Sequence, residues 1–168
     1  MARATLPAHE VADLSLAAEG AARIAWAEEQ MPVLARIRER FARDRPLQGI
    51  GVAACLHVTA ETANLLLTLD AGGAGTALCS ANPLSTQDDV AAALVAEHGV
   101  EVRALHGESL DTYSGHVRAL LTGAPELTLD DGADLMITAH EVGGPGFERL
   151  IGGTEETTTG LVRLRRLQ

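Results

Sequence analysis

The segment 154–160 has the residue types of a site that could bind a sugar and an amide. After Thr154 it contains two adjacent glutamates, three threonines and a glycine: Glu155, Glu156, Thr157, Thr158, Thr159 and Gly160. Carboxylates accept hydrogen bonds from ribose hydroxyls, and threonine hydroxyls and backbone N–H groups can bind an amide or a phosphate. The structural alternative is a helix that starts with Thr154 as its N-cap, although Thr157 does not complete a capping box. The segment alone leaves both interpretations open.

Short apolar runs are followed by three further polar clusters, at 55–62, 82–88 and 130–134. Ligands of an open parallel sheet bind at the carboxyl ends of its strands, so we expect all four polar segments to meet at one edge. There His57, Asp131 and Glu156 would perturb one another's pKa values, as acid–base groups in a cleft do. Each cluster also has a structural interpretation, as a helix cap, a turn or a hydrogen-bonded histidine. No pair of candidate ligands has the spacing of a metal motif, so no metal site is predicted.

The elements that must position these clusters alternate along the chain. After helical patterns at 11–30 and 31–43, short apolar runs typical of buried strands lie at 50–56, 75–79, 100–105, 127–129 and 150–151. Further helical patterns lie at 59–70, 86–97, 110–121, 133–140 and 156–168. The alternation predicts one α/β domain, residues 1–168, with a mostly parallel sheet and helices on both faces, a three-layer flavodoxin-like or Rossmann-like fold. The arginines of the second helix are expected on its solvated face: Arg36, Arg38, Arg40 and Arg43.

Composition excludes several classes of function. The net charge of −10 argues against binding to nucleic acid or to an anionic membrane. No apolar run is long enough to span a bilayer and the N-terminus has no hydrophobic signal region, so a cytoplasmic protein is expected. Cys55 and Cys79 lie in apolar strand-like segments, which predicts buried free thiols. All 13 basic residues are arginine, so the sequence has no lysine for a Schiff base or a P-loop.

Four motifs, in this order, resemble the S-adenosyl-L-homocysteine hydrolase family: 55–63, 80–89, 129–135 and 155–160. Segments 11–16 and 29–32 also resemble its opening helices, so the likeness covers nearly the whole chain. Segment 82–84, Asn-Pro-Leu, resembles the compact microbial form. Ala133 stands where the family usually has a second glycine, and Thr154 stands where it often has a serine. Neither departure removes a working group.

The resemblance implies an NAD-dependent enzyme that reversibly hydrolyses S-adenosylhomocysteine to adenosine and homocysteine, and usually a homotetramer. NAD oxidises the ribose 3′-hydroxyl, the ketone acidifies the C4′ proton, homocysteine is eliminated, water adds, and the ketone is reduced again. The residues carried over for the substrate are Thr59 and Glu61 at the adenine, His57 and Asp131 for protons near the 5′ leaving group, and Glu156 at the ribose hydroxyls. Those carried over for the nicotinamide end of NAD are Thr157, Thr158 and Thr159.

The family's NAD-binding domain and catalytic lysine have no counterpart in this sequence. Segment 143–146 is rich in glycine but lacks the strand–helix context of a dinucleotide motif. We therefore expect the N-terminal substrate-binding part of such a hydrolase, cut after Gln168, without the NAD-binding domain and inactive alone. The alternative is a stand-alone adenosyl-nucleoside-binding module without redox catalysis, whereas a flavodoxin-like receiver would need the missing lysine. The sequence does not distinguish adenosine from inosine, and it does not fix the oligomeric state.

Overall fold

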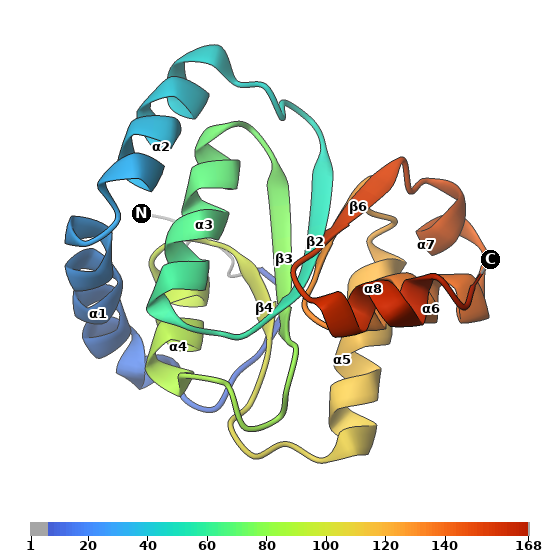
Figure 1. Ribbon diagram of the computed structural model, residues 1–168. Coiled ribbons are helices and arrows are strands. Elements are labelled where there is room, and N and C mark those ends of the chain that lie inside the picture. Colours follow the sequence, from blue (N-terminus) through green and yellow to red (C-terminus); the bar gives the residue numbers. More distant parts are fainter. Residues whose placement is uncertain (1–6, 168) are drawn as a thin grey trace.

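The computed structural model describes residues 7–167, which form a six-stranded parallel sheet with helices on both faces (Figure 1). The strands are β1 (His9–Glu10), β2 (Gly51–Leu56), β3 (Gly75–Ser80), β4 (Glu101–Arg103), β5 (Leu127–Asp130) and β6 (Gly152–Glu155). Their order across the sheet is β1-β4-β3-β2-β5-β6, and every pair is parallel. The predicted three-layer α/β fold is confirmed.

Each buried strand is followed by a helix that packs back onto the sheet. The helices are η1 (Leu14–Leu16), α1 (Ala17–Glu29), α2 (Pro32–Asp44), α3 (Ala60–Ala71), α4 (Asp88–Ala96), α5 (Leu110–Thr122), α6 (Asp134–Val142), α7 (Pro145–Glu148) and α8 (Thr158–Leu164). Helices α1, α3 and α4 cover one face, and α5 and α6 cover the other (Figure 1). Within residues 7–167, no helix is long and apolar enough to cross a bilayer.

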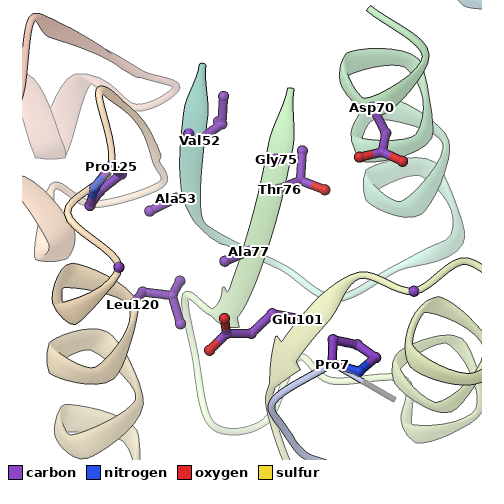
Figure 2. Close-up of a pocket in the computed structure, with 13 residues that line it drawn as sticks. Pro7, Val52, Ala53, Asp70, Gly75, Thr76, Ala77, Glu101, Leu120 and Pro125 are labelled. Carbon is purple, nitrogen blue, oxygen red and sulfur yellow. The ribbon is translucent and has the colours of Figure 1, made fainter. Parts of the chain in front are cut away.

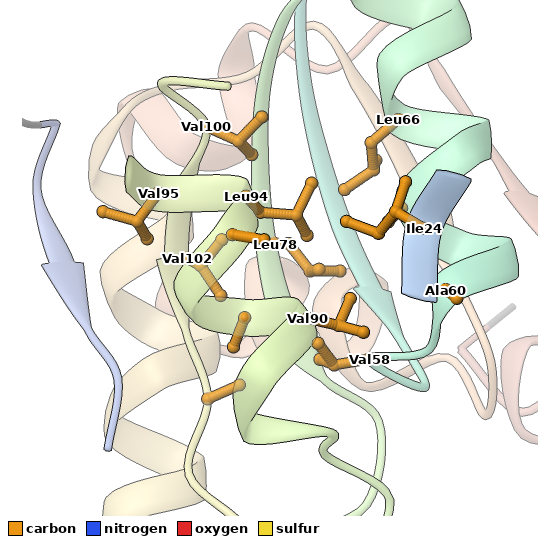
Figure 3. Close-up of a cluster of buried hydrophobic side chains, with 14 of the residues drawn as sticks. Ile24, Val58, Ala60, Leu66, Leu78, Val90, Leu94, Val95, Val100 and Val102 are labelled. Atoms are coloured by element: carbon orange, nitrogen blue, oxygen red, sulfur yellow. The ribbon is translucent and has the colours of Figure 1, made fainter. Parts of the chain in front are cut away.

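Two apolar clusters, one on each face, hold the layers together. The cluster under α1, α3 and α4 brings together aliphatic side chains from helices and sheet, among them Ile24, Leu66, Leu78, Leu94 and Val102 (Figure 3). Successive residues of a strand point to opposite faces, so a strand buried on both sides is apolar along its whole length. With so few aromatic residues, alanine and branched aliphatic residues fill the space between the layers.

The second cluster lies between the sheet and α5 and α6, and it contains both cysteines. Cys55 and Cys79 face each other across β2 and β3, and both are fully buried and free. The prediction of buried free thiols is therefore confirmed. Val117 from α5 and Leu135 from α6 pack against the same face of the sheet.

The last strand and helix start later than the sequence pattern indicates. Residues 150–151 were expected to form this strand, but β6 begins at Gly152 and includes Thr154. Thr154 is therefore no helix cap, and Thr157 caps α8 instead by accepting a hydrogen bond from the Gly160 N–H at 2.9 Å. The pairing of β6 with β5 outweighs the low strand propensity of its two glycines, because the neighbouring strand supplies the backbone partners. The expected helix 156–168 is shorter, and Gln168 lies outside the described residues.

Two short elements were absent from the sequence prediction. Strand β1 has only two residues, His9 and Glu10, and pairs with the edge of β4. Helix α7 occupies part of the glycine-rich segment 143–146, with Gly144 as its N-cap and Pro145 in its first turn. Elements of two to four residues carry too little periodicity to be recognised from sequence.

Arg38 was expected to be solvated, but it turns inward from α2. Its guanidinium donates to Glu28 Oε1 at 2.8 Å, to the backbone and side-chain oxygens of Asn64 at 3.0 and 2.7 Å, and to Thr68 Oγ1 at 3.2 Å. This expectation was therefore wrong for Arg38. Burying this charged group is tolerated because its N–H groups donate hydrogen bonds to acceptors on α1 and α3.

Candidate functional site

The carboxyl ends of β2, β5 and β6 lie side by side and bring the polar segments to one edge of the sheet. Cys55 pairs with Asp130, and Asp130 pairs with Glu155, so the following residues of the three strands lie in one row. The Asp131 N–H donates to the Cys55 carbonyl at 3.0 Å, and the Glu156 N–H donates to the Asp130 carbonyl at 2.9 Å. Backbone pairing therefore places Asp131 and Glu156 next to each other at the adjoining ends of β5 and β6.

His57 and Asp131 are in direct contact at this edge. His57 Nε2 lies 3.0 Å from Asp131 Oδ2, and His57 Nδ1 lies 2.6 Å from Ser85 Oγ. The His57 side chain is 50% exposed, whereas that of Asp131 is 18% exposed, so the histidine is the partner that a ligand can reach. Glu156 is exposed on the same edge. A histidine and a carboxylate in contact can pass a proton to or from a bound molecule.

The loop that carries Asp131 has an unusual backbone. Gly132 has φ = +106° and Ala133 has φ = +69°, and Ala133 is fully buried. A left-handed conformation is costly for alanine and free of steric cost for glycine. This explains in physical terms why a glycine would suit the position of Ala133. The loop bends sharply, so that Asp131 faces His57 and the chain can enter α6.

Glu155, next to Glu156, points back into the protein and supports the Asp131 loop. Its Oε1 accepts hydrogen bonds from the Gly132 N–H at 3.0 Å, the Thr157 N–H at 2.8 Å and the Thr157 hydroxyl at 2.6 Å. Partial burial raises the Glu155 pKa, but these hydrogen bonds outweigh burial and hold the pKa below its usual value. Glu155 is therefore an ionised support for the loop, and Glu156 is the exposed member of the pair.

The three threonines after Glu156 differ in how free their side chains are. The Thr157 hydroxyl already donates to Glu155 and accepts from the Gly160 N–H. Thr158 and Thr159 are exposed in the first turn of α8. Two of the three residues expected at the cofactor therefore present free hydroxyls, while Thr157 shapes the turn.

Thr59 and Glu61 lie at the start of α3, beside His57. The Thr59 hydroxyl caps this helix by accepting from the Thr62 N–H at 3.4 Å, and Glu61 is exposed in the first turn. A hollow of about 400 Å³ opens between this helix start and the loop after β3. Its lining residues are His57, Thr59, Leu84, Ser85, Thr86, Gln87 and His106.

Sequence reasoning missed two residues that hold the Asp131 loop from other helices. Arg163 of α8 donates to the Gly132 carbonyl and, at 2.7 Å, to Asp134 Oδ1. The Tyr113 hydroxyl of α5 donates to Asp134 Oδ2 at 2.5 Å. Tyr113 is the single tyrosine of the chain, which was the available signal, whereas no local pattern marks Arg163.

A second hollow, of about 360 Å³, lies at the opposite edge of the sheet (Figure 2). Its wall includes the strand starts Gly51, Gly75 and Glu101, together with Thr76 and Pro125. The predicted site residues are absent from its lining. Because open parallel sheets bind ligands at their carboxyl ends, we place the candidate site at the His57 edge. Among residues 7–167, no group of three or more His, Cys, Asp or Glu side chains is placed to hold a metal ion.

Comparison with known proteins identifies relatives of this chain. A model of the S-adenosyl-L-homocysteine hydrolase family matches residues 8–144. The adenosylhomocysteinase of Aquifex aeolicus is 55% identical over 159 residues, which cover 94% of this chain and 38% of that enzyme. Those of Gloeobacter violaceus and Sulfurisphaera tokodaii are 52% and 50% identical, each over 95% of this chain. The chain thus spans less than two fifths of the length of these curated relatives.

Proposed function

This chain belongs to the S-adenosyl-L-homocysteine hydrolase family, and we propose that its carboxyl-edge site binds the nucleoside part of S-adenosylhomocysteine. The observation that carries the proposal is the contact of 3.0 Å between His57 and Asp131, on the same edge as the exposed Glu156. A nucleoside at this edge would meet an acid–base pair and a free carboxylate, the groups that its ribose chemistry needs.

Glu156 binds the ribose hydroxyls in this proposal. Its carboxylate is exposed at the end of β6, and its backbone N–H is fixed to the Asp130 carbonyl. An ionised carboxylate accepts hydrogen bonds from two neighbouring hydroxyls more strongly than a neutral group does. Thr59 and Glu61, at the start of α3, face the adenine.

In this proposal, His57 and Asp131 transfer the proton to and from the 5′ side of the sugar. A carboxylate only accepts hydrogen bonds, so Asp131 holds a proton on His57 Nε2 and orients the ring. His57 is the half-exposed partner, and the proton that it exchanges with the leaving group or with water is carried on Nδ1, because Nε2–H stays directed at Asp131. Asp131 stabilises the charged imidazole that forms during this exchange.

The residues of this chain could bind only one part of NAD, its nicotinamide end. When bound, the cofactor supplies the oxidation and later reduction at the ribose 3′ position. Thr158 and Thr159 offer exposed hydroxyls to its amide, whereas the Thr157 hydroxyl is occupied by Glu155 and Gly160. We propose that the 168 residues alone bind a nucleoside without turning over substrate, because they contain neither a lysine nor a dinucleotide-binding glycine motif.

Calorimetry of this chain with adenosine, with and without NAD, tests the proposal. We expect weak binding of adenosine and no release of homocysteine from S-adenosylhomocysteine. Glu156→Gln removes a charge-assisted hydrogen bond to the ribose and should weaken binding roughly tenfold or more. Glu39→Gln, an exposed change on α2, is the matched control and should leave binding unchanged.

Three results would contradict parts of this proposal. Failure of the folded chain to bind adenosine, or equal binding by the Glu156→Gln and Glu39→Gln variants, would rule out the nucleoside site. Release of homocysteine by the wild-type chain would refute the expectation that it cannot turn over alone. Because these residues contain no dinucleotide-binding glycine motif, NAD should not change the affinity for adenosine, and tighter binding of adenosine with NAD would contradict that expectation.

A further inference from the structure

Ser85 lies between the imidazole of His57 and a backbone carbonyl of its own loop. Its Oγ is 2.6 Å from His57 Nδ1 and 2.9 Å from the Asn82 carbonyl oxygen. A hydroxyl has one proton to donate and two lone pairs that can accept. Ser85 can therefore donate to only one of these two groups at a time, and it can accept from the other only if that group carries a proton.

The protonation state of His57 decides which way the hydroxyl of Ser85 points. Asp131 accepts from Nε2–H, so Nδ1 of the neutral ring has no proton and accepts a hydrogen bond from Ser85. When the ring is charged, Nδ1–H donates to the oxygen of Ser85 instead. The hydroxyl proton of Ser85 then turns to the Asn82 carbonyl at 2.9 Å, an oxygen that it shares with the Ser85 N–H and the Ser80 hydroxyl; Ser80 Oγ itself lies 3.3 Å from Ser85 Oγ.

We propose that Ser85 is a positioning residue that keeps His57 Nδ1 hydrogen-bonded in both protonation states, by rotating its hydroxyl between the imidazole and the Asn82 carbonyl. The inference deepens the proposed function, because a histidine that moves protons there must be held equally well before and after the transfer. The turn of the hydroxyl exchanges its hydrogen bond to Nδ1 for one to the Asn82 carbonyl, and the proton that charges the ring arrives on Nδ1 from water or from the bound molecule.

The loop around Ser85 is anchored well enough for this role. The Ser85 N–H donates to the Asn82 carbonyl at 2.9 Å, and the Leu84 N–H donates to Asn82 Oδ1 at 2.8 Å. The hydroxyl of Ser80, which is fully buried at the end of β3, donates to the Asn82 carbonyl at 2.6 Å. Ser85 is thus fixed to the sheet through its backbone and through Asn82.

The titratable groups that this edge of the sheet places around His57 are Asp131, His106, Glu61 and Glu156. Asp131 faces Nε2, and His106 lines the same hollow, where its Nδ1 lies 3.2 Å from the Thr86 carbonyl. The backbone of His106 is fixed by a hydrogen bond, because its N–H donates to Asp88 Oδ1 at 3.0 Å. The partner of Nδ1 is therefore Ser85.

Imidazole NMR of the isotope-labelled chain, without any ligand, tests the proposal. In wild type, we expect Nδ1 of neutral His57 to resonate as a hydrogen-bonded acceptor, and Nδ1–H of the charged ring to exchange slowly with water. In Ser85→Ala, neutral Nδ1 should shift to the position of an unbonded nitrogen. The charged Nδ1–H should exchange roughly fivefold faster, the effect of one ordinary hydrogen bond. A His57→Gln variant assigns the signals.

Two further variants separate this role from a general effect on folding. Ser85→Thr retains the hydroxyl and should restore both signals, whereas Ser109→Ala, which removes the hydroxyl that caps α5, should leave both as in wild type. A change in only one protonation state, or no change in Ser85→Ala, would overturn the proposal, as would an equal change in Ser109→Ala. Because no nucleoside is present, these results stand apart from the adenosine-binding test.

Discussion

Asp130 and Asp131 are sequence neighbours with opposite surroundings. Asp131 contacts His57 at the edge of the sheet, whereas Asp130 is 2% exposed and accepts from the Leu135 and Met136 N–H groups at 2.9 and 3.0 Å. Burial raises the pKa of Asp130 to about 6, although these two hydrogen bonds oppose the change. Asp130 therefore accepts hydrogen bonds from the first turn of α6, whereas Asp131 faces the candidate site.

The raised pKa of Asp130 predicts how stability depends on pH. The folded state binds this proton more tightly than the unfolded state, whose pKa is near 3.8. The free energy of unfolding therefore falls as the pH rises from about 4 to about 6, and stays level above that range. One pKa unit corresponds to about 1.4 kcal/mol, so the loss attributable to Asp130 is about 3 kcal/mol.

Urea unfolding of wild type and Asp130→Asn at several pH values isolates this contribution. The asparagine cannot titrate, so its variant should lack the part of the slope between pH 4 and pH 6 that Asp130 causes. Other buried carboxylates, such as Glu108, titrate in both proteins and cancel in the difference. Parallel curves for the two proteins would show that Asp130 is not the titrating group.

Single residues of the site were predictable from sequence only where their type signals chemistry. His57 and Asp131 follow apolar strand-like runs, and the carboxyl ends of parallel strands meet at one edge, so their proximity could be inferred. Ser85 or Thr86 would be expected to cap the following helix, because serine and threonine are favoured at N-caps, but α4 has Gln87 at its N-cap and no side-chain cap hydrogen bond. Arg163 reaches the Asp131 loop from a distant helix, and such long-range pairs have no local signal.

At the scale of elements, α8 and the Asp131 loop meet through Glu155 and Gly160. A Cβ atom at Gly160 would lie 2.2 Å from the Glu155 carboxyl carbon. The carboxylate is the flexible end of its side chain and could move aside, but it would then lose its bonds to the Gly132 N–H and to Thr157. The close approach of helix and strand here requires glycine because of those hydrogen bonds.

Gly160→Ala should therefore destabilise the protein and disturb the site together. We expect the free energy of unfolding to fall by about 2 kcal/mol, through lost hydrogen bonds to a charged group, and adenosine to bind more weakly because the Asp131 loop loosens. Urea unfolding and calorimetry measure the two effects. Gly115→Ala on α5 is the control, because its Cβ would meet nothing within 4 Å and alanine favours a helix by about 0.5 to 1 kcal/mol. A stable Gly160→Ala protein with unchanged affinity would refute this account.

The boundaries of elements were less predictable than their existence. Helices α3 and α5 follow the expected 59–70 and 110–121 closely, because a capping threonine or serine marks each start. Strand β6 was displaced in the prediction, because Leu150 and Ile151 are apolar whereas the residues that pair with β5 are Gly152 to Glu155. The position of β6 is determined by its pairing with β5, and a local sequence pattern does not encode that pairing.

For the whole molecule, the alternation of apolar runs and helical patterns was sufficient to predict the parallel α/β class. The order of the strands was not predicted, because it depends on which helices return to which face of the sheet. The two apolar clusters show the outcome, with α1, α3 and α4 on one face and α5 and α6 on the other. This arrangement covers the carboxyl-terminal halves of β2 and β3 on both faces and explains why both cysteines are buried.

The accessibility of the two thiols measures whether the helices stay packed on the sheet. Cys55 and Cys79 are fully buried, and a hydrogen bond with Cys55, followed by burial, raises the pKa of Cys79. The reactive species of a cysteine is its thiolate, so the burial of both thiols and the raised pKa of Cys79 disfavour reaction in the native state. Access to either thiol requires α5 and α6 to separate from the sheet, because these helices cover that face.

A thiol reagent should therefore modify Cys55 and Cys79 only through global unfolding of the chain. We expect both to react at one slow rate, and the opening free energy derived from labelling to equal the free energy of unfolding measured in urea. An added thiol at an exposed position, Ser15→Cys, should react at the rate of a free thiol and serves as the control. Faster modification of either native cysteine would show that α5 and α6 open locally and that the molecule does not unfold as one cooperative unit.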